Sequence, residues 1–218
     1  MLIVKLNVVM LVKGRERLTV QSIESLLKNT PRDSYNLTIV DDGSLSDWTP
    51  INLLMSVNLW TMLKIRNSKG ITGMARNLGV WWSERYWGRG DYLYLTDNDV
   101  YFTPGWIEKL IPFIQEQTLN IIGGWNHPFL QPHQKLPDVI NSMLYATHDA
   151  VAGASQMMRW WVWDKYGPLD AVAPGVGQSE DWAMCQRIVK DGGRVGSIYP
   201  RVIFNTGLTN SLGEPSPG

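Results

Sequence analysis

The sequence predicts a single α/β domain with a mixed, mainly parallel central sheet flanked by helices. Apolar strand-like runs alternate with helical patterns along the first hundred residues, which is typical of βαβ units. The length of 218 residues fits one sizeable domain. With 44% hydrophobic and 18% charged residues, the chain has enough apolar material for a core and lacks the composition of disorder.

The elements before residue 90 follow this alternation in order. An apolar run predicts the first strand, and apolar residues at helical spacing predict the helix after it. Breaks rich in Asn, Asp, Gly and Pro separate the elements. We expect strands at about 4–12, 37–40 and 61–65. We also expect three helices. The first carries the apolar residues from Leu18 to Leu27, the second begins near Thr49-Pro50, and the third carries Ala75 and runs towards Trp87.

The next strand, at about 92–95, delivers the acidic triplet Asp97-Asn98-Asp99, and a turn at 103–105 then opens another helix. The carboxylates therefore lie at the carboxyl end of a strand, where open α/β sheets bind ligands. Mg²⁺ and Mn²⁺ are commonly held by one or two carboxylates plus substrate phosphates. Taken alone, such a triplet is more often a solvated acidic turn than a metal site, by about nine to one.

Charge and cysteine content narrow the class of partner and compartment. Lys plus Arg and Asp plus Glu both number 20, so nothing in the balance attracts nucleic acid or an anionic membrane. The apolar start is interrupted by Lys5 and Asn7 and is too short to span a bilayer. The single cysteine, Cys185, excludes an intramolecular disulfide and suits a reducing compartment. We expect a cytoplasmic protein without a membrane span.

Five short segments occur in an order that resembles one enzyme family. Each is weakly specific alone. They are Val40 to Ser44, Gly73 to Gly79, Thr96 to Asp99, Trp163 to Asp170 and Gln178 to Trp182. Together they resemble the inverting glycosyltransferases of family 2, which have the GT-A fold.

The resemblance implies an organisation and an activity. It implies a GT-A domain over 1–206, with a nucleotide-sugar half at about 1–100 and an acceptor half at about 101–206, followed by a flexible tail at 207–218. The implied enzyme is a hexosyltransferase-type glycosyltransferase. It would move a sugar from a nucleoside diphosphate sugar, UDP being the expected nucleotide, to a saccharide or other hydroxyl acceptor with inversion.

The donor side is implied residue by residue. Asp42 would accept a hydrogen bond from the uracil, and Arg76 would pair with the diphosphate as a planar fork donor. Without the resemblance, these residues would read as an ordinary Asp/Gly turn and an exposed helix arginine. The full predicted donor set is Val12, Lys13, Arg15, Asp42, Arg76, Asp97 and Asn98.

For the cation, Mn²⁺ or Mg²⁺, the resemblance implies that Asp99 binds it directly and that Asp97 contacts the ribose or the cation. The metal would neutralise charge on the departing diphosphate. Many relatives add a histidine near the end of the sheet, whereas this chain has Asn205 in the corresponding stretch. An amide oxygen can ligate the cation but supplies no charge.

The acceptor side is implied by Glu180 and Asp181, which open a helical pattern. By resemblance, Asp181 is the general base for the acceptor hydroxyl and Glu180 orients the acceptor. An acidic pair at a helix N-terminus is also electrostatically favoured by itself. Trp160, Trp161 and Trp182 are candidate platforms for a sugar ring, although tryptophans more often pack in the core.

Two other classes stay open. A non-catalytic module that binds nucleotide sugars or glycans would explain Asn205 and the small size, whereas the intact aspartates argue for an enzyme. A sugar-1-phosphate nucleotidyltransferase ranks last, because Lys13-Gly14-Arg15 is a thin version of the Gly-rich, basic signature of that class.

Overall fold

The structure is a computed structural model that describes residues 4–45, 60–66, 70–116, 119–124, 138–140, 143–171, 180–199 and 201–207. The helix expected near Thr49-Pro50, and the tail beyond Gly207, lie outside the described residues. The strands are β1 (Leu6–Val12), β2 (Tyr35–Asp41), β3 (Trp60–Lys64), β4 (Tyr92–Asp97), β5 (Val100–Phe102), β6 (Ile121–Gly123), β7 (Asp138–Ile140), β8 (Met143–His148), β9 (Ser155–Arg159), β10 (Val195–Tyr199) and β11 (Ile203–Asn205). The helices are α1 (Glu16–Asn29), η1 (Arg32–Ser34), α3 (Thr72–Trp87), α4 (Trp106–Gln115), α5 (Trp160–Tyr166) and α6 (Glu180–Lys190).

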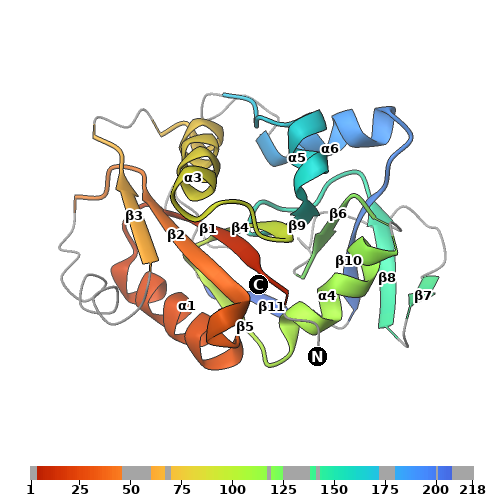
Figure 1. The fold of residues 1–218 in the computed structure, drawn as a ribbon, viewed down its shortest axis with the longest axis horizontal. Coiled ribbons are helices and arrows are strands. Elements are labelled where there is room, and N and C mark those ends of the chain that lie inside the picture. The colour runs from red at the N-terminus through yellow and green to blue at the C-terminus, as the bar shows by residue number, and fades with distance from the viewer. Residues whose placement is uncertain are drawn as a thin grey trace.

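The described strands form a mixed sheet in the order β3-β2-β1-β4-β9-β6-β10-β8-β7 (Figure 1). The pairings make β9 and β8 run against the other strands. The predicted α/β class with a mainly parallel sheet is therefore confirmed, and β1, β2, β3, β4, α1 and α3 lie where the pattern placed them.

The register brings several strand ends to one edge. Val12 at the end of β1 pairs with Asp41 at the end of β2, and Leu11 pairs with Asp97 at the end of β4. We call this the carboxyl edge and the opposite side the amino edge. Because β9 is antiparallel to β4, Ser155 lies towards the carboxyl edge and Arg159 at the amino edge.

Helices cover both faces of the sheet, α1 and α4 on one and α3, α5 and α6 on the other (Figure 1). Alternate residues of β1 divide between the two cores. Val8 and Met10 pack in the cluster that includes Ile23 and Trp106, whereas Val9 packs in the cluster that includes Ala75. Burial on both faces explains why this strand reads as a continuous apolar run.

Helix α3 packs unusually close to the sheet. A Cβ atom on Gly79 would lie 2.4 Å from Cγ2 of Val40 and 2.6 Å from Cγ1 of Val9. Only glycine permits this approach. The close packing fixes the helix that carries Arg76, one turn earlier, against the ends of the strands.

A two-stranded sheet completes the edge. In it β11 pairs with β5 antiparallel, with Asn205 opposite Val100. This pairing brings the end of the described chain beside the acidic triplet. Among the described helices, none has the length and apolarity needed to cross a bilayer.

Candidate active site

The two aspartates of the triplet are each held by an arginine at the carboxyl edge. Arg15 binds Oδ2 of Asp99, and NH2 of Arg76 binds Oδ1 of Asp97 at 2.5 Å. The side chain of Asp99 is only 9% exposed, whereas that of Asp97 is 34% exposed. Asp97 is thus the more open of the two carboxylates.

Asn98, between the two aspartates, makes hydrogen bonds to the start of the first helix and the loop before it. Its amide donates to the carbonyl of Gly14 at 3.0 Å and to the hydroxyl of Thr19 at 2.7 Å. These bonds hold the loop before α1, in which Arg15 has a left-handed backbone with φ 55°. The structure therefore places Asn98 beneath the loop that presents Arg15.

Burial raises the pKa of Asp99 to about 6, the negative charge of Asp97 adds to this, and Arg15 opposes it. The ionised form of Asp99 is thus disfavoured where it stands. A cation bound between the two carboxylates would favour that form.

Asn205 lies beside Asp99. A Cβ on Gly207 would fall 2.3 Å from Oδ2 of Asp99 and 3.1 Å from Oδ1 of Asn205. The backbone N–H of Gly207 donates to that Asn205 oxygen at 2.8 Å, and the N–H of Thr206 donates to the carbonyl of Asp99 at 2.7 Å. The absence of a side chain at Gly207 leaves the space beside these oxygens clear.

These oxygen donors fit Mn²⁺ or Mg²⁺. Hard cations prefer carboxylate, carbonyl and amide oxygens. In the part of the chain that the structure describes, no three His, Cys, Asp or Glu side chains gather around one point. Among the described residues, the amide oxygen of Asn205 is an oxygen donor that lies beside Asp99.

The predicted nucleotide residues Val12, Lys13 and Asp42 lie together where β1 and β2 end. The N–H of Asp42 donates to the carbonyl of Val12 at 2.8 Å, and its carboxylate lies 3.4 Å from Nζ of Lys13. Ser44 ties the two loops, since its hydroxyl accepts from the N–H of Gly14 at 2.8 Å.

Asp41 has a different task from its neighbour. It is fully buried, and its Oδ1 accepts from the N–H of Ser44 at 2.8 Å. Its other oxygen lies 3.5 Å from Nζ of Lys64 on β3. This aspartate shapes the turn, whereas Asp42 lies beside Lys13 of the predicted donor set.

Arg76 lies beneath the site rather than at its surface. Its side chain is 3% exposed, and its Nε lies 3.9 Å from Oε1 of Glu180. Burial disfavours its charge, yet the surrounding Asp97, Glu180 and Asp181 raise its pKa above the ordinary value. The structure therefore places Arg76, the residue predicted to bind the diphosphate, between Asp97 of the acidic triplet and the pair Glu180-Asp181.

Asp181, in the first turn of α6, is held from two sides. Its Oδ2 accepts from the N–H of Gly153 at 2.7 Å, and its Oδ1 accepts from the N–H of Trp182 at 2.8 Å. Burial raises the pKa of the neighbouring Glu180, and Arg76 opposes that shift. Both acidic residues are thus brought to the same end of the sheet as Asp97.

Two of the sequence segments also meet through Asn77. Its amide donates to the carbonyl of Leu169 at 2.8 Å, and its carbonyl accepts from the N–H of Leu169 at 2.9 Å. This pair fastens α3 to the loop after α5.

The three candidate acceptor tryptophans separate in space. Trp182 is adjacent to Asp181 on α6 and partly buried. Trp160 is buried at the amino edge, with the guanidinium of Arg89 4.7 Å from its ring centre. The structure thus brings Trp182, and not Trp160, to the predicted base.

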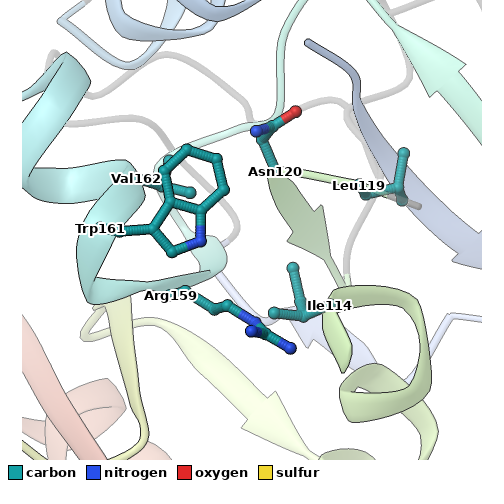
Figure 2. A pocket seen from close by; sticks show the side chains of 6 residues that line it. All are labelled: Ile114, Leu119, Asn120, Arg159, Trp161 and Val162. Carbon is teal, nitrogen blue, oxygen red and sulfur yellow. The ribbon is translucent and has the colours of Figure 1, made fainter. Parts of the chain in front are cut away.

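Trp161 is also at the amino edge. It is 44% exposed and lies beside a cavity of about 110 Å³ together with Asn120 and Arg159 (Figure 2). Because Arg159 pairs with Tyr92 at the start of β4, this cavity is at the opposite edge from Asp97. It is separate from the candidate active site.

Solved structures share this fold at low sequence identity. GalNAc-T7, solved with UDP, GalNAc and Mn²⁺, superposes with a TM-score of 0.68 at 16% identity, over 90% of this chain and 43% of the other. Staphylococcus aureus TarS 1–349 gives 0.67 at 15% identity, over 94% and 60%. The mannosyltransferase PcManGT from Pyrobaculum calidifontis, solved with GDP-Man and Mn²⁺, gives 0.64 at 14%, over 87% and 53%.

This chain therefore spans between about two fifths and three fifths of those chains. No curated protein matches the sequence. The model of glycosyl transferase family 2 matches residues 7–148. Since that match covers more than half of the 218 residues and the fold agrees with it, the chain belongs to glycosyl transferase family 2.

Proposed function

We propose that this protein is a metal-dependent glycosyltransferase that moves a sugar, of the hexosyl type, from a nucleoside diphosphate sugar to a hydroxyl acceptor with inversion. The observation that carries the proposal is the gathering of Asp97, Asp99, Asn205 and Asp181 at one edge of the sheet, where Arg15 holds Asp99 and the buried Arg76 lies between Asp97 and Asp181. Two similar folds were solved with Mn²⁺ and a nucleotide or nucleotide sugar, which supports a donor of this class.

The nucleotide would lie across the ends of β1 and β2. There Asp42 presents a carboxylate that can accept a hydrogen bond from a nucleobase imide, beside Val12 and Lys13. The uracil of UDP carries such an N–H, and UDP is the nucleotide that we propose. Asp97, Asp99 and Asn205 would hold the cation, which when bound supplies Lewis-acid stabilisation of the departing diphosphate.

Asp181 is the group proposed to take the proton from the acceptor hydroxyl. As the acceptor oxygen forms its bond to the anomeric carbon, the bond from that carbon to the diphosphate oxygen breaks, and the proton passes to the Asp181 carboxylate. Attack from the face opposite the leaving group inverts the anomeric carbon. Glu180 and Trp182, adjacent to the base, would orient the acceptor.

The halves of the domain are assigned on the same basis. Residues up to about 100 supply the predicted nucleotide contacts, and residues 101–206 supply the base and the acceptor surface. The one cysteine, Cys185, is buried in α6, which agrees with a reducing compartment such as the cytoplasm.

The test is turnover of a panel of UDP- and GDP-sugars in the presence of Mn²⁺, followed by Asp181→Asn on the donor that the wild type consumes. Loss of a general base lowers kcat by about 10²- to 10⁴-fold, while donor affinity stays. Asp164→Asn is a matched control, because Asp164 is exposed and pairs with Arg89 at the amino edge. Unchanged kcat in Asp181→Asn would refute the base, and lost donor affinity would make it a donor ligand.

A further inference from the structure

Gly153, just before β9, contacts both halves of the candidate active site. Its backbone N–H donates to Oδ2 of Asp181 at 2.7 Å. On its other side, a Cβ would lie 2.1 Å from NH1 and 2.7 Å from Cζ of Arg76. Its φ is not in the left-handed region. What demands glycine here is therefore space for the guanidinium, and not backbone conformation.

The guanidinium that fills this space has few hydrogen bonds of its own. NH2 of Arg76 binds Asp97, but Nε and NH1 are buried and make no hydrogen bond with the described part of the chain. Nε lies 3.9 Å from the carboxylate of Glu180, too far for a hydrogen bond. The position of the guanidinium thus depends on packing against the α-carbon of Gly153 as well as on the bond to Asp97.

We propose that Gly153 is a positioning residue for the transfer reaction. Its N–H binds the carboxylate of Asp181, and its α-carbon, which has no side chain, packs against the guanidinium of Arg76. Because Arg76 binds Asp97, Gly153 couples the position of the predicted base to that of the proposed metal ligand Asp97. This inference rests on the proposed function, because it gives Asp181 and Asp97 their roles.

The coupling matters because the two carboxylates act on opposite sides of the anomeric carbon. One prepares the attacking oxygen and the other helps to hold the leaving group. Any shift of Gly153 moves the N–H that holds Asp181 and the surface that supports Arg76 at once. A misplacement of about 1 Å in such an arrangement can lower the rate about 100-fold.

The direct test is Gly153→Ala, assayed for turnover of the donor that the wild type consumes and for binding of UDP with Mn²⁺ by calorimetry. We expect kcat to fall about 100-fold and the nucleotide Kd to rise by much less, because Asp99 is held by Arg15 and not by Arg76. A glycine with a purely structural role would lower thermal stability without this split.

Gly193→Ala is the matched control. Its added Cβ would also overlap neighbours, at 2.6 Å from Ile188 and 2.6 Å from Asn120, but it follows α6 at the amino edge. We expect it to destabilise the fold and to leave kcat within about twofold of wild type, as for an independent site. An equal loss of kcat in both variants would overturn the proposal.

The double variant Gly153→Ala with Arg76→Lys completes the cycle. Lysine keeps the charge but lacks the NH1 atom that the added methyl would meet, so Gly153→Ala should cost much less in the lysine background. If Gly153→Ala alone does not fold, the double variant should fold. A double variant that also fails to fold would overturn the proposal that Arg76 packs against Gly153. Additive losses of kcat would also overturn it.

The cycle separates two kinds of failure. A wild type that shows no Mn²⁺-dependent binding or turnover of any nucleotide sugar contradicts the proposed function. A wild type that turns over donor, with a Gly153→Ala variant that keeps full kcat, contradicts only the role of Gly153.

Discussion

Arg76 at the carboxyl edge and Arg89 at the amino edge are two arginines held by carboxylates, and they differ in nearly every other respect. Arg89 makes two bonds to Asp164, at 2.7 and 2.8 Å, and one to Glu84 at 2.8 Å. Its side chain is 38% exposed. Arg76 is 3% exposed and makes one hydrogen bond, to Asp97.

We expect the arginine with the better hydrogen-bond geometry, Arg89, to contribute less to the stability of the fold. Exposed pairs, even well aligned, are screened by water and salt. A buried guanidinium of which two nitrogens make no hydrogen bond with the described residues is a poor choice for stability alone, since buried polar groups are normally hydrogen-bonded. The difference indicates that Arg76 is kept at this position by its interactions with the surrounding carboxylates. Departures from the rule that buried polar groups are hydrogen-bonded occur most often at functional sites.

The largest effect expected from this contrast is on stability at Arg76. Arg76→Met leaves Asp97 and Glu180 without their cation. Removal of one partner from a buried pair costs about 3–5 kcal/mol of unfolding free energy. Urea unfolding of the variant and the wild type measures it, and a change as small as that of an exposed pair would show that Arg76 is not integral to the buried site.

Asn205→Ala is expected to have the next largest effect, on metal affinity. Loss of one neutral ligand should weaken Mn²⁺ binding about tenfold, equivalent to about 1.4 kcal/mol. Asn205→Asp should tighten binding, because it adds a charge to the ligand set. Calorimetry with Mn²⁺ and UDP distinguishes the two, and identical affinities in both variants would remove Asn205 from the metal site.

A smaller effect is expected at Arg89. Arg89→Met should cost less than about 1 kcal/mol of unfolding free energy, as for exposed pairs, and the difference should shrink at high salt. The same urea series measures it. A loss as large as that at Arg76 would show that exposure does not separate the two arginines.

The smallest effect is expected at Trp161. Trp161→Leu changes the wall of the amino-edge cavity and nothing near Asp181. Donor turnover and saturation by acceptor should stay within about twofold of wild type, as for distant independent sites. A selective rise in the acceptor KM would instead restore Trp161 as an acceptor residue.

The sequence predicted the first four strands and the placement of the acidic triplet at the end of β4 well, because both follow from local patterns. A buried parallel strand such as β1 is a continuous apolar run, and the triplet follows β4 directly. The position of Asn205 beside Asp99, expected from the resemblance alone, required the long-range pairing of β11 with β5.

Helix α3 shows why the rest could not be predicted. Its apolar Met74, Leu78 and Trp81 are exposed, whereas Arg76 and Gly79 are buried. Apolar periodicity alone would predict the wrong buried face for this helix, because it assigns the apolar residues to the side that packs against the sheet. Arg76 therefore read as a ligand at the surface.

Gly153 and the tryptophans show the same limit. The role of Gly153 depends on Arg76 and Asp181, which are distant in sequence, so no local pattern marks it. Trp160 and Trp161 follow β9, and only the antiparallel direction of that strand places them at the amino edge. A prediction that took β9 as parallel would have put them beside the base.

The measurement that tests the central claim most directly is calorimetric titration of UDP and GDP into the protein with and without Mn²⁺, repeated on Asp99→Asn. The account predicts nucleotide binding that requires Mn²⁺ and is lost in Asp99→Asn, while the fold is retained. Binding that is independent of both the metal and Asp99, or no binding of either nucleotide, would contradict it.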